Sequence, residues 1–155
     1  MPTEVSADER VGGFPAQLME LLRRTGDELL EACNSVEREL SVLVTHDEGM
    51  RILNAKWRGL DEPTDVLSFA FDEVSEHHAW MPIGDIIINL ERADLQREEH
   101  GLTLEEEMIY LLVHGLCHLR GFDHAEPQEA AAMRLEEERL LALVSIQAKR
   151  PEKFF

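Results

Sequence analysis

The spacing of apolar residues along the chain alternates between a helical and an extended period. Leucines recur at three- and four-residue intervals from residue 14 to residue 34, which predicts an amphipathic helix. Shorter helices are predicted over residues 47–57, with Asp47 as the N-terminal cap, and over residues 91–100. Short runs rich in β-branched and aromatic residues predict three strands, at residues 40–45, 65–71 and 83–89.

The most apolar predicted helix lies in the second half of the chain. Thr103 and Glu106 have the spacing of a capping box, so a helix is expected to begin there. Its middle, residues 108–113 (MIYLLV), is apolar on every side, and such a helix is buried in a core. Gly121 is expected to end it, and Pro127 to open a last helix that reaches about residue 148.

These elements predict one α+β domain over residues 1–155, in which helices pack on a small mixed sheet, because strands and helices do not alternate regularly. A chain of this length can bury a core without disulfides. Residues 1–12 are expected to be a frayed lead-in that contains at most a weak edge strand, and residues 72–81 an acidic loop.

Charge and composition limit the class of partner. Against 15 Lys and Arg stand 32 Asp and Glu, a net charge of −17, which argues against broad binding to nucleic acids but permits one locally basic cleft. Cys33 and Cys117 are too few for a disulfide framework and suit a reducing compartment. No segment resembles a signal peptide or the about 20 apolar residues of a membrane span, so a soluble, cytoplasmic protein without a membrane partner is expected.

Residues 114–124 (HGLCHLRGFDH) carry three histidines at the spacing of the zinc-peptidase signature H-E-x-x-H-x-x-G-x-x-H. His114 and His118 are one helical turn apart and share a helix face. Gly121 lets the chain turn back, which is expected to bring His124 beside them. Three neutral imidazoles with an open fourth position are typical of a catalytic zinc site, although nickel, copper or iron also accept such ligands.

Other residues near the triad receive lesser roles. Asp123 is adjacent to a ligand and could orient an imidazole. Cys117 is interpreted as a packing residue rather than a fourth ligand, because free cysteines are usually buried. The remaining histidines lie on predicted loops or helix ends and are interpreted as solvated: His46, His77, His78 and His100.

Gly115 stands where the peptidase signature has the glutamate that activates water. Loss of that base typically lowers the rate by orders of magnitude, so phosphodiester chemistry fits the site at least as well as proteolysis. Such chemistry needs a cation for the developing charge. Arg58, which is followed by Gly59 before a strand, is the best candidate, whereas Arg51 and Lys56 are interpreted as a solvated helix edge.

Three blocks of the chain resemble the YbeY family of endoribonucleases, which are bacterial rRNA maturation factors. Residues 53–71 (LNAKWRGLDEPTDVLSFAF) are similar to its L-N-x-x-[YW]-R-G-x-D-x-P-T-D-V-L-S-F-P-F motif. Residues 83–88 (IGDIII) are similar to its L-G-D-I-x-I strand, and residues 114–124 to its H-G-x-L-H-L-x-G-[YF]-D-H motif. Ala70 and Cys117 stand where the family has proline and leucine.

The resemblance implies an α+β fold around a zinc cleft, with one Zn²⁺ per chain bound by His114, His118 and His124. It makes Arg58 the catalytic or substrate-positioning arginine. It also implies cleavage of single-stranded RNA in an rRNA precursor, in small-subunit rRNA 3′-end maturation and ribosome quality control, with the small ribosomal subunit or its assembly factors as partners. Lesser candidates for supporting the metal or contacting the substrate are Asp123, Asp85 and Ser68.

Two other functions stay open at this point. One is a metallopeptidase that uses a different carboxylate, such as Asp85 or Glu91, and the other is a non-catalytic ribosome-assembly factor with a structural zinc. The sequence identifies neither a general base nor whether water or the ribose 2′-hydroxyl attacks, and it leaves the oligomeric state undetermined.

Overall fold

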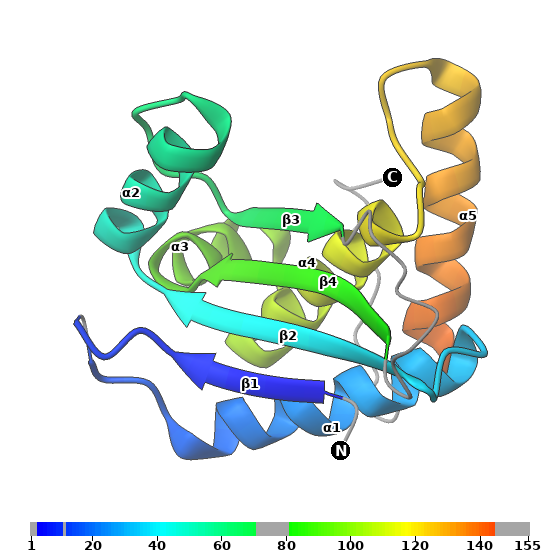
Figure 1. Cartoon of the computed structure of the whole chain (residues 1–155), viewed down its shortest axis with the longest axis horizontal. Coiled ribbons are helices and arrows are strands. Elements are labelled where there is room, and N and C mark those ends of the chain that lie inside the picture. Colours follow the sequence, from blue (N-terminus) through cyan, green and yellow to red (C-terminus); the bar gives the residue numbers. More distant parts are fainter. Residues whose placement is uncertain (1–2, 11, 71–80, 145–155) are drawn as a thin grey trace.

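Figure 1 shows the computed structural model, which describes residues 3–10, 12–70 and 81–144. Its four-stranded sheet has the order β1–β2–β4–β3. The strands β1 (Thr3–Ala7), β2 (Arg38–Thr45) and β4 (Met81–Asn89) are parallel, and β3 (Val66–Ala70) pairs antiparallel with β4. The expected mixed sheet is therefore confirmed.

The weak edge strand expected within the amino-terminal segment is present as β1, which is paired along its whole length. All five residues of this strand pair with β2. The backbone N–H of Thr3 donates to Oδ1 of Asp27 at 3.0 Å, and that of Asp8 to the carbonyl of Val44 at 2.9 Å. These partners lie far along the chain, so the local pattern could not show that they fix the segment.

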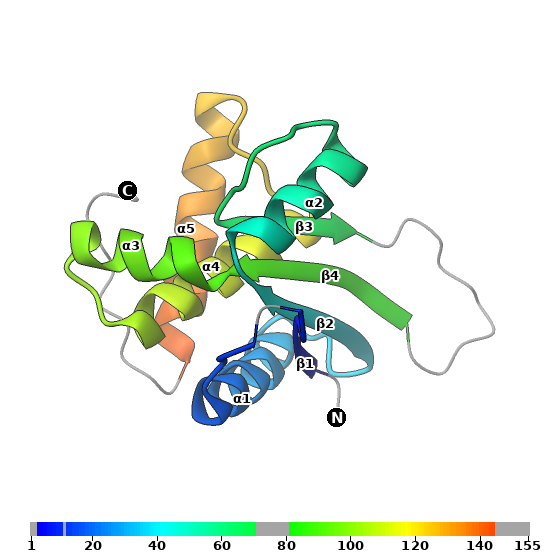
Figure 2. The same cartoon turned by 90° about the vertical axis from the view of Figure 1, so that its left-hand side faces the viewer.

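One face of the sheet is covered by α1 (Ala16–Ala32) and α4 (Leu104–Leu119), and this is where the main core lies (Figures 1 and 2). The helix α4 also contacts α3 (Leu90–His100) and α5 (Pro127–Leu143), so it is central in the molecule. The prediction that this helix is buried is confirmed. No helix within the described ranges is long and apolar enough to cross a membrane.

The opposite face of the sheet is covered in part by α2 (Asp47–Arg58). Alternate residues of a strand point to opposite faces. Accordingly Ile86 and Ile88 belong to the main core, whereas Ile87 packs with Met50 of α2 in a second, smaller cluster. The carboxyl end of α2 and the strand β3 therefore meet at one edge of the sheet.

The helix ends agree only partly with the sequence. The capping box of α4 is confirmed: the hydroxyl of Thr103 accepts from the N–H of Glu106 at 3.1 Å, and the Glu106 carboxylate accepts from the N–H of Thr103 at 3.0 Å. Asp47 is not a cap, because it is the first helical residue of α2 and His46 precedes it. Its carboxylate instead accepts from the side-chain amide of Asn89 at 2.6 Å.

The last helix is shorter than expected, since α5 ends at Leu143 and Val144 is extended. Residues beyond 144 lie outside the described part of the chain. The same holds for residues 71–80, which contain most of the predicted acidic loop together with His77 and His78.

Candidate metal centre

The carboxyl end of α4 brings the three histidines together. His114 and His118 lie in its last two turns, which end at Leu119. Gly121 has φ 94°, and its N–H donates to the carbonyl of His118 at 3.0 Å, while the N–H of Phe122 donates to the carbonyl of Cys117 at 3.0 Å. This pair of bonds is a Schellman motif, which reverses the chain after a helix.

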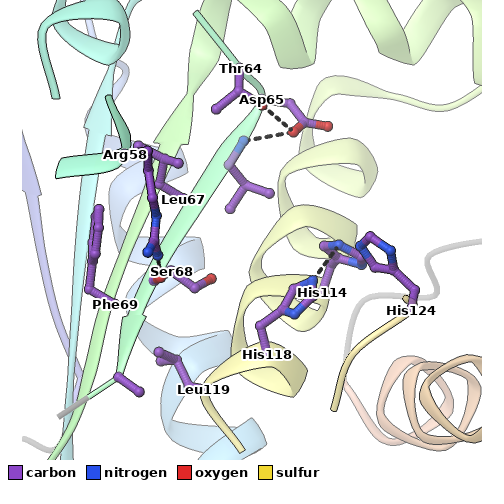
Figure 3. A pocket seen from close by; sticks show the side chains of 12 residues that line it. Arg58, Thr64, Asp65, Leu67, Ser68, Phe69, His114, His118, Leu119 and His124 are labelled. Atoms are coloured by element: carbon purple, nitrogen blue, oxygen red, sulfur yellow. Dashed lines mark hydrogen bonds between the residues drawn. The ribbon is translucent and has the colours of Figure 1, made fainter. Parts of the chain in front are cut away.

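The reversal places His124 against the two helical histidines (Figure 3). One nitrogen from each of the three rings lies within 4.8 Å of the others, and Nε2 of His114 is 3.2 Å from Nε2 of His118. Zinc–nitrogen bonds of about 2.0–2.1 Å in a tetrahedral site put two ligand nitrogens roughly 3.3 Å apart. The spacing and the all-nitrogen donor set therefore fit a metal of the zinc class.

The local electrostatics favour the neutral form of His118. Burial lowers the pKa of His118, and the neighbouring His114 and His124 lower it further. A neutral imidazole is the form that binds a metal.

Glu137 of α5 is a partner of the triad that the sequence did not reveal. Its Oε2 lies 3.1 Å from Nδ1 of His114, and its side chain is 6% exposed. The hydroxyl of Tyr110, one turn before His114, is hydrogen-bonded to the same carboxylate, and burial together with this carboxylate raises the pKa of Tyr110. The sequence did contain a signal for this role, because Glu137 is a charged residue at a position of α5 that shares the buried face with Met133 and Leu140.

Arg58 and β3 form the opposite wall of a cavity of about 700 Å³ that the three histidines line (Figure 3). Arg58 is the last residue of α2, and Gly59 at φ 72° turns the chain away after it. The guanidinium donates to the carbonyl of Ser68 at 2.7 Å and lies 4.6 Å from the ring centre of Phe69. Arg58, Ser68 and the three histidines, which are all candidate site residues from the sequence, thus line one cavity.

Gly115 lies where α4 packs closely on the sheet. A Cβ atom on Gly115 would lie 2.9 Å from Cγ2 of Ile86 and 3.1 Å from the hydroxyl of Ser68. The side of the helix at this position therefore faces β3 and β4. Any side chain at this position would have to displace the side chain of Ile86, so the close packing here favours glycine.

Asp85 and Asp123, also candidates from the sequence, are not among the residues that line this cavity. Asp85 lines a separate cavity of about 420 Å³, together with Trp57 and Ile87 on the α2 side of the sheet. Asp123 is exposed, and its carboxylate accepts from the backbone N–H of His124 at 2.7 Å. In the described part of the chain, the carboxylate bonded to a ligand imidazole is Glu137, not Asp123.

His46, His100 and Cys117 lie outside the cluster. The interpretation of His100 as solvated is wrong, because its side chain is 12% exposed and lies 2.8 Å from the buried Glu107. His46 is partly exposed and lies 3.3 Å from Glu91. Cys117 is fully buried in the main core, where burial raises the pKa of its thiol. This agrees with its interpretation as a packing residue.

Fold and site together define a small α+β protein with a cleft whose histidines could hold a metal. The chain belongs to the YbeY family, since the family model described as Endoribonuclease YbeY matches residues 8–145.

Individual relatives agree with this assignment, and one solved structure shares the fold. The chain is 44% identical over 114 residues to the Endoribonuclease YbeY of Heliobacterium modesticaldum, covering 68% of this chain and 69% of that protein. It is 40% identical over 129 residues to that of Thermus thermophilus, covering 83% and 93%. The solution structure of TM1509 from Thermotoga maritima has the same fold, with a TM-score of 0.56 and 22% identity, covering 90% of this chain and 89% of that one.

Proposed function

We propose that this protein is a zinc-dependent endoribonuclease that cuts single-stranded RNA. Its place would be the cytoplasm, in small-subunit rRNA 3′-end maturation and ribosome quality control, with an rRNA precursor as substrate and the small ribosomal subunit or its assembly factors as partners. The observation that carries the proposal is that Arg58 and the triad line the same cavity. The relatives' name, endoribonuclease, supports RNA as the substrate.

His114, His118 and His124 would hold one zinc ion per chain. When bound, zinc polarises a phosphoryl oxygen and makes a water molecule more acidic. Arg58 would bind the phosphate. Its exposed guanidinium has no ion pair with a described carboxylate and uses one donor on Ser68, so its other donors are available to phosphate oxygens.

The surface next to this cavity suits a single strand in spite of the net charge. Seven arginines in the described ranges are engaged by carboxylates: Arg10, Arg23, Arg51, Arg92, Arg97, Arg120 and Arg139. Lys56 and Arg58 have no such ion pair in the same ranges. Beside them Trp57 is 59% exposed, and Lys56 lies 5.1 Å from the centre of its ring. Cations beside an exposed aromatic ring bind backbone and base of single-stranded RNA.

Asp65 is the carboxylate available to take a proton in this cavity. It is the one acidic residue among the described residues that line it. Its Oδ1 accepts from the N–H of Val66 at 2.8 Å, which fixes the side chain at the start of β3. A carboxylate held in this way can serve as a general base for water or for the ribose 2′-hydroxyl.

The proposal is tested with purified protein and a single-stranded RNA. Cleavage should require added zinc after chelation, and His114→Ala and Arg58→Ala should each reduce it by at least 100-fold. Arg51→Ala is the matched control, because Arg51 lies on the same helix but is engaged by Glu48 and Asp61. If the His114 and Arg58 variants cut as fast as the parent, the cleavage comes from a contaminant and the proposal fails.

Neither rival function gains an observation in its favour. Asp85 lies on the other side of the sheet, and Glu91 accepts from the N–H of Asp47 at 3.2 Å instead of lining the metal cavity. A casein assay is therefore expected to be negative. Chemical analysis of the RNA product ends would show whether water or the 2′-hydroxyl attacks.

A further inference from the structure

Glu137 is a buried carboxylate that forms no ion pair with a lysine or arginine within the described ranges. It lies between Glu136, which is paired with Arg120 and Arg139, and Glu138. In the described part of the chain its ion-pair partner is His114 alone. Burying a carboxylate is costly unless hydrogen bonds and charges compensate it. Its position therefore requires an explanation that involves His114.

The hydrogen bond from His114 determines which of its nitrogens faces the triad. Nδ1 of His114 lies against Glu137, and Nε2 of the same ring lies against Nε2 of His118. An imidazole that donates its Nδ1 hydrogen has a lone pair on Nε2, which is the form needed to bind a metal there. The carboxylate therefore selects the tautomer and fixes the ring plane.

Tyr110 fixes the carboxylate in turn. Its hydroxyl is hydrogen-bonded to Glu137, and its ring stacks on that of His114 with the ring centres 6.0 Å apart. Tyr110 and His114 are i, i+4 on α4, whereas Glu137 reaches them from α5, 23 residues beyond His114. The chain Tyr110–Glu137–His114 thus joins the two helices directly behind the triad.

We propose that Glu137, held by Tyr110, is a positioning residue that orients His114 for metal binding. This inference rests on the metal site of the proposed function, but not on RNA as the substrate. It also assigns a role to α5. This helix carries none of the three histidines, but it supplies the carboxylate that orients His114.

The test compares Glu137→Gln with Glu129→Gln in the full chain. Glutamine keeps the size of the side chain but removes its charge and can donate to Nδ1, which favours the wrong tautomer. Zinc affinity, measured by competition with a chromogenic chelator, should fall 10- to 100-fold for Glu137→Gln. Glu129 is exposed on the same helix, so Glu129→Gln should bind zinc as the parent does.

Two further readouts separate positioning from folding. The melting temperature of the metal-free Glu137→Gln protein should lie within a few degrees of the parent, and the visible spectrum of its cobalt form should differ from that of the parent. If Glu137→Gln does not fold, Tyr110→Phe decides, because it removes only the hydroxyl that holds the carboxylate. Tyr110→Phe is expected to weaken zinc binding several-fold.

Unchanged zinc affinity in Glu137→Gln, or in Tyr110→Phe where the first variant does not fold, would overturn the inference. Failure of the proposed function looks different. In that case the parent binds zinc and loses affinity on Glu137→Gln, yet RNA stays intact. Conversely, RNA cleavage by the parent together with full zinc affinity in Glu137→Gln would contradict the inference and agree with the proposed function.

Discussion

Ser68 donates its hydroxyl hydrogen to the backbone carbonyl of Gly115 at 3.2 Å, and this contact joins β3 to α4 one residue after His114. The helix approaches the sheet this closely because residue 115 has no side chain. The wall that carries Arg58 and the helix that carries the triad are thereby held at a fixed separation. Glycine at this position therefore shapes the cavity.

Gly115→Ala should lower the stability of the protein. The added methyl would meet Cγ2 of Ile86 at 2.9 Å, and overpacking of this kind costs about 1–3 kcal/mol. Helix propensity returns about 1 kcal/mol, so a net loss of up to about 2 kcal/mol is expected. The free energy of unfolding in urea measures the difference. Adding Ser68→Ala removes the 3.1 Å contact but also the hydrogen bond to the Gly115 carbonyl, so it should recover part of the loss at most. A Gly115→Ala protein as stable as the parent would contradict this packing argument.

Asp65→Asn should lower kcat for RNA by about 10²–10⁴-fold, because an amide cannot accept the proton. The KM and the melting temperature should change little, since the asparagine oxygen can still accept from the N–H of Val66. Asp61→Asn is the control, because Asp61 is an exposed carboxylate that pairs with Arg51. Steady-state kinetics of both variants measure the effect. Parental kcat in Asp65→Asn would remove Asp65 from the mechanism.

Trp57→Ala should raise KM for single-stranded RNA and leave kcat nearly unchanged. A stacked base contributes about 1–3 kcal/mol, so KM is expected to rise roughly 5- to 150-fold. Ile52, an exposed apolar residue of the same helix, provides the control Ile52→Ala. An RNA with an abasic nucleotide at the stacked position should be insensitive to Trp57→Ala. A fall in kcat at constant KM would show that Trp57 acts on the cleft geometry and not on a base.

Two carboxylates should make the fold sensitive to acid. Hydrogen bonding with Arg10 holds the pKa of Asp8 at about 2, below its ordinary 3.8, and hydrogen bonding with Arg139 and Arg120 lowers that of Glu136 from 4.5 to about 2. The unfolded chain therefore binds protons at a higher pH than the folded chain does. These groups stabilise the fold above about pH 4, and their contribution should be lost between about pH 4 and pH 2.

Asp8→Asn isolates one of these contributions. The variant should be less stable than the parent at pH 7, and the difference should shrink as the pH falls from about 4 to 2, where about half of the parent's Asp8 is protonated. Urea unfolding across this pH range measures it. Glu129→Gln, a change on an exposed helix surface, should give a curve parallel to that of the parent. A difference for Asp8→Asn that is as large at pH 2 as at pH 7 would refute the assignment.

Local patterns predicted the parts of the fold that short-range contacts determine. The capping box at Thr103 and the apolar run after it define α4, because both depend on residues within a few positions of each other. Asp47 shows the limit of such patterns. Its side chain is suited to cap a helix, but it accepts a hydrogen bond from Asn89, which ends a strand and lies 42 residues further along the chain.

For the candidate site, local spacing was enough to predict the triad, because helical spacing fixes His114 and His118 and a glycine-terminated helix turns the chain to His124. Which groups support and face the triad depends on how the helices and strands pack. Glu137 contacts His114 because α5 packs on α4. Asp85 lies in a different cavity because alternate strand residues point to opposite faces of the sheet. Local spacing sets the direction of a side chain along its own element, but the packing of elements sets what that side chain meets.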